Sequence, residues 1–317
     1  MADQSVLSSR AVIGMYYERL AAATGVAWID ACSNYFTSYH DSEKYPWLGM
    51  VPALREWIGG RQAKSLSENY VDIVNKHYEA TIEFALRDLR RDKTPQIQAR
   101  INEFADRGIS HWASLLSTLL VNGATAVCYD GQYFFDTDHL EGASGTLSNK
   151  INVDISALPA TTHGTAVTAP SPEEMQQAIL AAISQMYTFL DDQGEPLNEN
   201  AQAFHVIAPV GLFAATRSAL TLVRQAAASV FDMTDFAITA SVNPRLTAAG
   251  WTDKFVTVRT DGAVKPLIRQ EETMTELKVK DEMSEYAFDN DAIQIGLDTW
   301  RNVGYGRWQG AVLTTLT

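Results

Sequence analysis

A helical pattern between residues 94 and 122 constrains the fold of this 317-residue chain more than any other feature. Thr94 and Pro95 supply an N-cap and a proline at the first helical position, and Asn122 with Gly123 supplies a stop signal. Between these signals, apolar or small residues recur every three or four positions, at Ile97, Ile101, Phe104, Gly108, Trp112, Leu115 and Leu119. At a rise of 1.5 Å per residue, such a helix is about 40 Å long. That length is unusual in a compact domain, so we predict a spine helix along one edge of the fold.

A second feature is an apolar stretch at residues 45–62 that fits neither a regular helix nor a strand. Prolines and glycines interrupt it at Pro46, Gly49, Pro52, Gly59 and Gly60. It still carries many large apolar side chains, namely Trp47, Leu48, Met50, Val51, Leu54, Trp57 and Ile58. Because so much apolar surface on a loop would promote aggregation, we expect another surface to cover it. The charged Arg55, Glu56 and Arg61 are candidates for selecting that surface.

Composition and charge exclude several classes of protein. Only two cysteines occur, Cys32 and Cys128, without CxxC spacing, so we expect a reducing compartment and no disulfide framework or structural zinc site. The N-terminus lacks a signal-peptide pattern, and no apolar run reaches the roughly 18 residues of a membrane helix. A formal net charge of −13 argues against a protein that grips nucleic-acid phosphates. It is compatible with a surface that merely encloses nucleic acid.

The residues before the spine predict a helix, an arm and a strand. The helix covers residues 6–23 and ends at a Thr-Gly pair. The aromatic residues within 35–45 have no regular period, so we expect an extended arm lying against another part of the structure. Residues 78–87 alternate between apolar and polar side chains, which is typical of a strand with one buried face. Together, residues 46–90 predict a long projecting hairpin.

The residues that follow the spine predict a short hairpin and then a region of little order. Asp130 and Gly131 are typical turn residues between strands at 125–129 and 132–135. Residues 141–170 are rich in Gly, Ser, Thr, Ala and Asn, so we expect a surface excursion there.

The second half of the chain predicts helices packed on a mixed sheet. Ser171 to Glu174 reads as a capping box with proline at the first helical position. The pattern then runs helix, strand, helix, strand to residue 242, with short connections. Residues 254–268 predict a hairpin turning at Asp261 and Gly262, and residues 293–316 predict further strands. The fold class is therefore α+β.

One cluster of residues resembles a metal or acid/base site. Asp136, Asp138 and His139 place two carboxylates beside an imidazole, a set that can bind a cation or relay protons. A metal-dependent hydrolase is the function that this cluster would support. The alternative is a polar turn in which Asp and Thr bond the local backbone. No phosphate-binding, nucleophile-elbow or HExxH motif accompanies the cluster, so catalysis is not the favoured interpretation.

Two stretches carry a resemblance to a known family. They are Trp-Leu-Gly-x-x-Pro-x-Leu-Arg-Glu-Trp-Ile-Gly-x-Arg at 47–61 and Phe-Phe-Asp-Thr-Asp-His at 134–139. Both closely resemble the major head (capsid) subunit of Mu-like tailed bacteriophages. The resemblance implies the HK97-like capsid fold, with an N-terminal arm at 1–44, an E-loop at 45–92, a first part of the P-domain at 93–165 containing the spine helix at 94–122, an A-domain at 166–248 and a β-rich return to the P-domain at 249–317.

The resemblance also implies a function without catalysis. Copies of the chain would assemble into the pentamers and hexamers of an icosahedral shell enclosing double-stranded DNA. The shell would assemble in the host cytoplasm and form the capsid of the virion. The inter-subunit contact candidates are Trp47, Leu48, Arg55, Glu56, Trp57, Ile58 and Arg61. A separate scaffold or protease, a portal and a decoration protein are implied partners, with no cofactor, no metal and no membrane. A cargo-enclosing nanocompartment shell of the same fold is the alternative within this class.

Overall fold

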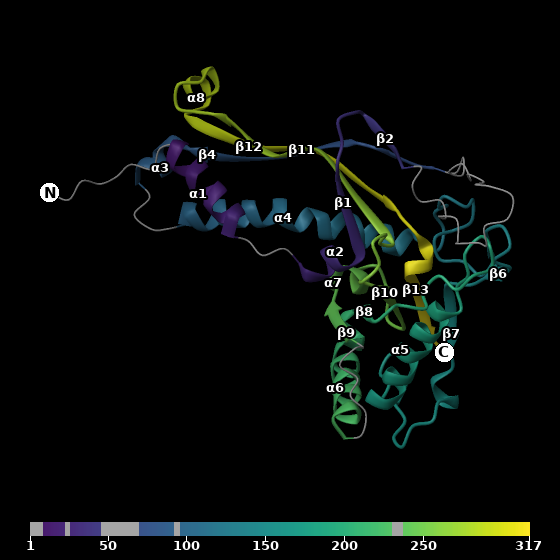
Figure 1. The fold of residues 1–317 in the computed structure, drawn as a ribbon. Helices are drawn as coiled ribbons and strands as arrows, with labels where there is room; N and C mark the ends of the chain where they lie inside the picture. Colours follow the sequence, from purple (N-terminus) through teal and green to yellow (C-terminus); the bar gives the residue numbers. More distant parts are fainter. Residues whose placement is uncertain (1–8, 23–25, 46–69, 92–95, 230–236) are drawn as a thin grey trace, which may run out of the picture.

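The computed structural model describes residues 9–22, 26–45, 70–91, 96–229 and 237–317. Figure 1 shows an L-shaped molecule in which a long helix and a long, narrow sheet form one limb. A second sheet with its helices forms the other limb, near the C-terminal end of the long helix. No helix among the described residues has the length and apolarity needed to cross a lipid bilayer.

The long helix is α4, Gln96–Asn122, and it confirms the predicted spine. It buries one face because its apolar and small residues recur at helical spacing. The buried residues are Ile97, Ile101, Ala105, Ala113, Leu116, Ser117 and Leu120. Helix α1, Ser9–Ala22, packs against it, and Arg19 pairs with Asp106 through two hydrogen bonds of 2.9 Å. The predicted first helix is therefore confirmed over its described part.

The four-stranded sheet lies along the spine in the order β1-β11-β12-β4 (Figure 1). Its strands are β1 Ser33–Thr37, β11 Leu267–Lys280, β12 Ala292–Tyr305 and β4 Lys76–Ala85. Strand β1 runs parallel to β11, and the other pairs are antiparallel. The predicted arm therefore includes a sheet strand, preceded by a short helix α2, Ala27–Cys32, that the sequence did not indicate. The predicted alternation in β4 is only partly present, because Phe84 is buried and Tyr78 and Ile82 are half-buried whereas Ala80 is exposed. The strand ends where α3, Leu86–Arg91, begins.

The five-stranded sheet has the order β7-β13-β10-β8-β9. Its strands are β7 Lys150–Val153, β13 Ala311–Leu316, β10 Lys254–Arg259, β8 Ala203–Ala208 and β9 Ala237–Val242. Strand β10 pairs with β8 and β13, whereas β11 belongs to the other sheet. The predicted hairpin at residues 254–268 is therefore wrong. Asp261 instead accepts hydrogen bonds from the backbone amides of Gln202 and Ala203, which hold the end of β10 beside the start of β8.

The predicted surface excursion at residues 141–170 is only partly correct. Strand β7 pairs in parallel with β13 and so belongs to the five-stranded sheet. Before it, β5 His139–Leu140 pairs with β6 Thr146–Leu147, and after it comes the short η2, Ile155–Ala157. Small and polar residues misled the composition argument, since strand partners so distant in sequence leave no local signal.

Helices cover the five-stranded sheet much as predicted. Helix α5, Pro172–Tyr187, begins with the predicted capping box, and η3, Val210–Leu212, leads into α6, Phe213–Ser229. Helix α7, Pro244–Ala248, follows β9, and η4, Trp308–Gly310, precedes β13. The main core gathers side chains from α5, β8, β10 and β13. The described elements therefore confirm the αβαβ order.

The five-stranded sheet combines strands from three of the predicted domain ranges, 93–165, 166–248 and 249–317. The division of the chain into arm, E-loop, P-domain and A-domain stays a prediction.

Candidate functional site

The apolar stretch at residues 45–62 lies outside the described residues except for Tyr45. All seven contact candidates, Trp47, Leu48, Arg55, Glu56, Trp57, Ile58 and Arg61, belong to the undescribed part, and their role stays a prediction. The structure does describe the two strands, β2 and β3, that flank the stretch and form the frame from which it leaves. Strand β2, Ser42–Tyr45, pairs antiparallel with β3, Val71–Val74, so both ends of the intervening segment start side by side.

A buried glutamine joins this frame to the four-stranded sheet. The Tyr45 hydroxyl and Gln270 Oε1 are 2.6 Å apart, and Gln270 Nε2 donates to the Ile73 carbonyl at 3.0 Å and to Asn75 Oδ1 at 2.8 Å. Because both limbs of the frame bond to one side chain of β11, the direction in which the segment leaves the sheet is constrained.

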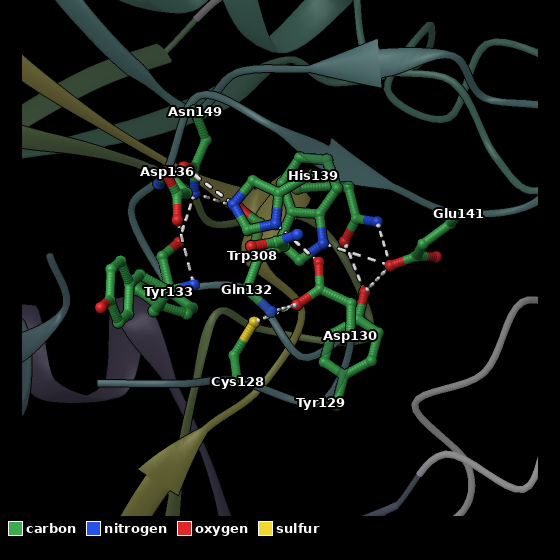
Figure 2. A network of polar contacts seen from close by, with 12 residues as sticks. Cys128, Tyr129, Asp130, Gln132, Tyr133, Asp136, His139, Glu141, Asn149 and Trp308 are labelled. Carbon is green, nitrogen blue, oxygen red and sulfur yellow. Dashed lines mark hydrogen bonds and ion pairs between the residues drawn. The ribbon is translucent and has the colours of Figure 1, made fainter. Parts of the chain in front are cut away.

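Two of the residues that suggested a metal site, Asp136 and His139, lie in a polar network after the spine (Figure 2). The chain leaves α4 at Gly123 and makes a tight turn at Gly131, whose φ of +86° favours glycine. The Cys128 amide donates to the Gln132 carbonyl at 2.8 Å, so the predicted hairpin is present as a short turn. A bridge between Val127 and Tyr133 completes it.

His139 and Asp130 form the centre of this network. His139 Nδ1 lies 2.6 Å from Asp130 Oδ2, and the two side chains are 0% and 2% exposed. Burial alone raises the pKa of Asp130, but hydrogen bonds from His139 and Cys128 outweigh it and lower that pKa below its ordinary value. The carboxylate is therefore the stable form of Asp130 in the folded chain.

The other side of the His139 ring is equally fixed. Its plane stacks on Trp308, with ring centroids 3.9 Å apart and 9° between the planes. Nε2 lies 3.2 Å from Asn149 Oδ1, and Asn149 Nδ2 donates to the Phe134 carbonyl at 2.7 Å. Both ring nitrogens lie near oxygen atoms, so the orientation of the ring is fixed at both ends.

A second, half-buried carboxylate extends the network toward η4. Glu141 Oε1 accepts hydrogen bonds from Trp308 Nε1 and Gln309 Nε2, each at 3.2 Å, and from the Tyr129 hydroxyl. Figure 2 shows the side chains of Tyr129, Glu141 and Trp308 beside one another. The network therefore ties the segment after the spine to η4.

Asp136 and Asp138 do not join His139 in a shared site. The Asp136 carboxylate accepts hydrogen bonds from the backbone of Thr137 and Tyr133 at 2.8 and 3.2 Å, and Asp138 is exposed. This corrects the metal interpretation and favours its alternative, a polar turn bonded to the local backbone.

Among the described residues, only Cys128, Asp130 and His139 bring three potential metal-ligand atoms within 4.8 Å of one another. Donor atoms around a tetrahedral ion at 2.0 to 2.3 Å would be roughly 3.3 to 3.8 Å apart. Here Asp130 Oδ2 is 2.6 Å from His139 Nδ1, and Asp130 Oδ1 is 2.9 Å from Cys128 Sγ. These spacings match hydrogen bonds, and burial further raises the pKa of the Cys128 thiol.

Sequence reasoning identified His139 but missed its partners. Asp130 was interpreted only as a turn residue, and Glu141, Asn149 and Trp308 carried no signal. Asn149 and Trp308 contact the His139 ring, and Glu141 bonds to Trp308. Trp308 is far from His139 in the sequence, and the pairing of β13 with β7 brings the two regions together.

The architecture defines a class of protein. Over 96% of this chain and 72% of the matched chain, the structure resembles the procapsid subunit of bacteriophage JBD30, with a TM-score of 0.54 and 22% identity. The fold is therefore that of the HK97-like phage capsid proteins.

The sequence comparisons specify the family. The model of the Mu-like prophage major head subunit gpT matches residues 11–159 and 230–316, and the chain belongs to this family. The Mu-like prophage FluMu major head subunit of Haemophilus influenzae is 36% identical over 112 residues, which are 35% of this chain and 36% of that protein. The major capsid protein of Escherichia phage Mu is 34% identical over 98 residues, 31% of this chain and 32% of that protein. The matched stretch thus spans about a third of each of these curated relatives.

Proposed function

We propose that this protein is the main subunit of a phage head and that its copies assemble into the hexamers and pentamers of an icosahedral shell. The family match over both ends of the chain carries this proposal. A closed shell suits a subunit with several modest contacts, because many equivalent weak interfaces add up to a stable particle.

The shell would enclose double-stranded DNA without binding it in a sequence-specific way. The net charge of −13 supports containment over tight binding, since a subunit that gripped phosphates would need a basic surface. Assembly would take place in the host cytoplasm, with a separate scaffold or protease, a portal and a decoration protein as partners. The role is structural and involves no catalysis.

The family match also separates this proposal from the two alternatives. A nanocompartment shell would share the fold, but the matched family consists of prophage head subunits. The hydrolase alternative depended on Asp136, Asp138 and His139 acting together, and Asp136 is occupied by the backbone of its own turn.

Electron microscopy of the purified protein tests the proposal directly. The chain, with any scaffold it requires, should yield closed particles of uniform size. Preparations that contain only folded single subunits or amorphous aggregates under all assembly conditions would contradict it.

The predicted contact residues allow a sharper test. Trp57→Ala should block shell formation while leaving a folded subunit or capsomer, because a truncated anchor weakens an interface without opening the subunit core. Trp57→Phe, which keeps a large apolar ring, is the matched control. Unfolding of the isolated subunit by Trp57→Ala would show that this side chain belongs to its own core.

A further inference from the structure

The β11–β12 hairpin ends in an exposed, apolar and acidic tip. Its residues 281–291 include helix α8, Glu285–Asn290, and Figure 1 shows them at the end of the long limb. Met283 is 95% exposed and Phe288 is 90% exposed. The same eleven residues contain five acidic side chains and no lysine or arginine. Large apolar groups exposed to this degree mark an interaction surface, and the charge indicates a basic partner.

The tip is held in a defined conformation. Ser284 caps α8 by accepting a hydrogen bond from the Ala287 amide, and Ala287 packs into the core beneath the hairpin. The Leu86 amide donates to the Asp291 carbonyl at 2.9 Å, which ties the tip to the end of β4. Because its backbone is already ordered, the tip loses little entropy when Phe288 and Met283 dock.

A cavity with the opposite charge lies between the spine and the four-stranded sheet. Its volume is about 240 Å³, and β4, α4, β11 and β12 all contribute to its lining. Ala80, Gly108 and Leu297 form apolar wall, while Arg107 at the exposed surface of α4 and the buried Arg301 supply positive charge. Glu79 also lines it, and its carboxylate accepts a hydrogen bond from the Thr81 hydroxyl at 3.0 Å.

Arg301 is an incompletely paired buried cation. Its residue is 3% exposed, and its Nε has no hydrogen-bond partner among the described residues. Its ion pair with Glu271 is long, at 3.8 Å, and its bonds to the Thr275 hydroxyl and the Gly108 carbonyl are 3.3 and 3.5 Å. Its Cζ lies 4.8 Å from the centroid of the Trp112 ring. A guanidinium with such long contacts can still gain energy from a carboxylate placed nearby in a site of low dielectric.

The tip cannot reach the cavity of its own chain. Leu297 of the cavity lies on β12 five residues beyond Ala292, where the tip ends, so the two are about 17 Å apart along a strand. Strand β12 is paired with β4 over this whole length, from Ala292 opposite Ala85 to Arg301 opposite Lys76. A tip that fills such a cavity must therefore come from another copy.

We propose that the tip of one copy docks into the Arg107–Arg301 cavity of a second copy, with Phe288 and Met283 on the apolar wall and the Glu285 and Asp289 carboxylates facing the two guanidinium groups. This inference rests on the proposed self-assembly. Each copy then carries one tip and one cavity, so the contact is heterologous and can be repeated around a ring.

Charge reversal on the full chain tests the contact. One variant carries Glu285→Arg and Asp289→Arg, and a second carries Arg107→Glu. Each alone should lower association by roughly tenfold or more, measured by sedimentation. An equal mixture should restore it, because the native tip of the second variant fits the native cavity of the first, and the two reversed surfaces fit each other. Arg217→Glu, the same change at an exposed position on α6, is the matched control.

The possible outcomes separate this contact from shell formation itself. If both variants form normal shells, or if their mixture associates no better than each alone while thermal melting shows them folded, the proposed contact is wrong and the head function stands. Equal loss in Arg217→Glu would show a response to net charge and would also overturn it. Loss and rescue without any closed particle would support the contact and count against the head function. A native chain that remains monomeric would overturn both the tip–cavity contact and the head function. If the variants form normal particles that lack a different protein, the tip binds that protein and the proposed contact is wrong.

Discussion

The imidazole of His139 and the carboxylate of Asp130 meet at 2.6 Å in a place that solvent hardly reaches. Removing His139 would leave the buried Asp130 carboxylate with only the Cys128 thiol and the Gln132 amide as hydrogen-bond partners. The pair therefore acts as an attachment point between the end of the spine and the five-stranded sheet.

We expect His139→Ala to lower the free energy of unfolding by about 3 to 5 kcal/mol, because it removes the partner of Asp130 Oδ2 in a buried place and the stack on Trp308. Urea unfolding of the isolated subunit measures this. Asp138→Ala, at an exposed neighbouring position, is the control and should change stability by no more than about 0.5 kcal/mol. Equal effects of the two changes would contradict the pairing described above.

The buried face of the spine gives a second prediction. Leu116 is fully buried in the main core, so Leu116→Ala should cost about 2 to 5 kcal/mol through lost burial and a residual cavity. Thermal or urea unfolding of the subunit checks the value. Thr118→Ala, two residues along on the exposed side of α4, should be nearly neutral. A neutral Leu116→Ala would mean that the spine does not pack as the structure shows.

The start of α5 gives a third prediction. Ser171 accepts a hydrogen bond from the Glu174 amide, and the Glu174 carboxylate accepts from the amides of Ser171 and Gly164 at 2.8 and 2.9 Å. Ser171→Ala should cost about 1 kcal/mol, the usual loss for an N-cap. Glu174→Ala should cost about 1 to 3 kcal/mol, because it leaves buried amides unpaired. Glu195→Ala, at an exposed position, is the control. Unfolding curves in which Ser171→Ala costs more than Glu174→Ala would count against the capping box.

The fourth prediction concerns pH. Burial lowers the pKa of His205 from 6.5 to about 4, where its ring lies 2.7 Å from the Thr239 hydroxyl and 2.8 Å from that of Ser241. Burial, Arg301 and Arg245 lower the pKa of His111 to about 4 as well. Between pH 6.5 and 4 the unfolded chain binds protons that the folded chain does not, so stability is complete above 6.5 and falls as the pH drops to 4.

Unfolding curves of the subunit at pH 7 and pH 4.5 measure this loss. The contribution of His205 is at most about 3 kcal/mol, because its pKa falls from 6.5 in the unfolded chain to about 4 in the folded chain. His205→Gln, which can still bond both hydroxyl groups, should remove that share and leave the share of His111. An unchanged pH slope in His205→Gln would show that His205 is not responsible.

The strand pairings show where sequence reasoning ends. Residues 254–259 and 263–268 flank the turn residues Asp261 and Gly262 as in a hairpin, yet β10 pairs with β8 and β13 while β11 pairs with β1 and β12. A turn motif marks where a chain can reverse, but it does not determine which strands become partners. The choice of partner depends on packing between segments far apart in the chain.

The sequence by itself determined the spine helix, the capping box at Ser171, the αβαβ order and, through residues 47–61 and 134–139, the resemblance to the head-subunit family. Each of these depends on a period or motif contained in a short segment. Only the tertiary structure decided how the strands are divided between two sheets and which groups surround His139. It also placed the acidic tip at one end of the hairpin and Arg301 in its middle. These features depend on contacts between residues far apart in sequence, and the propensities of local segments do not determine such contacts.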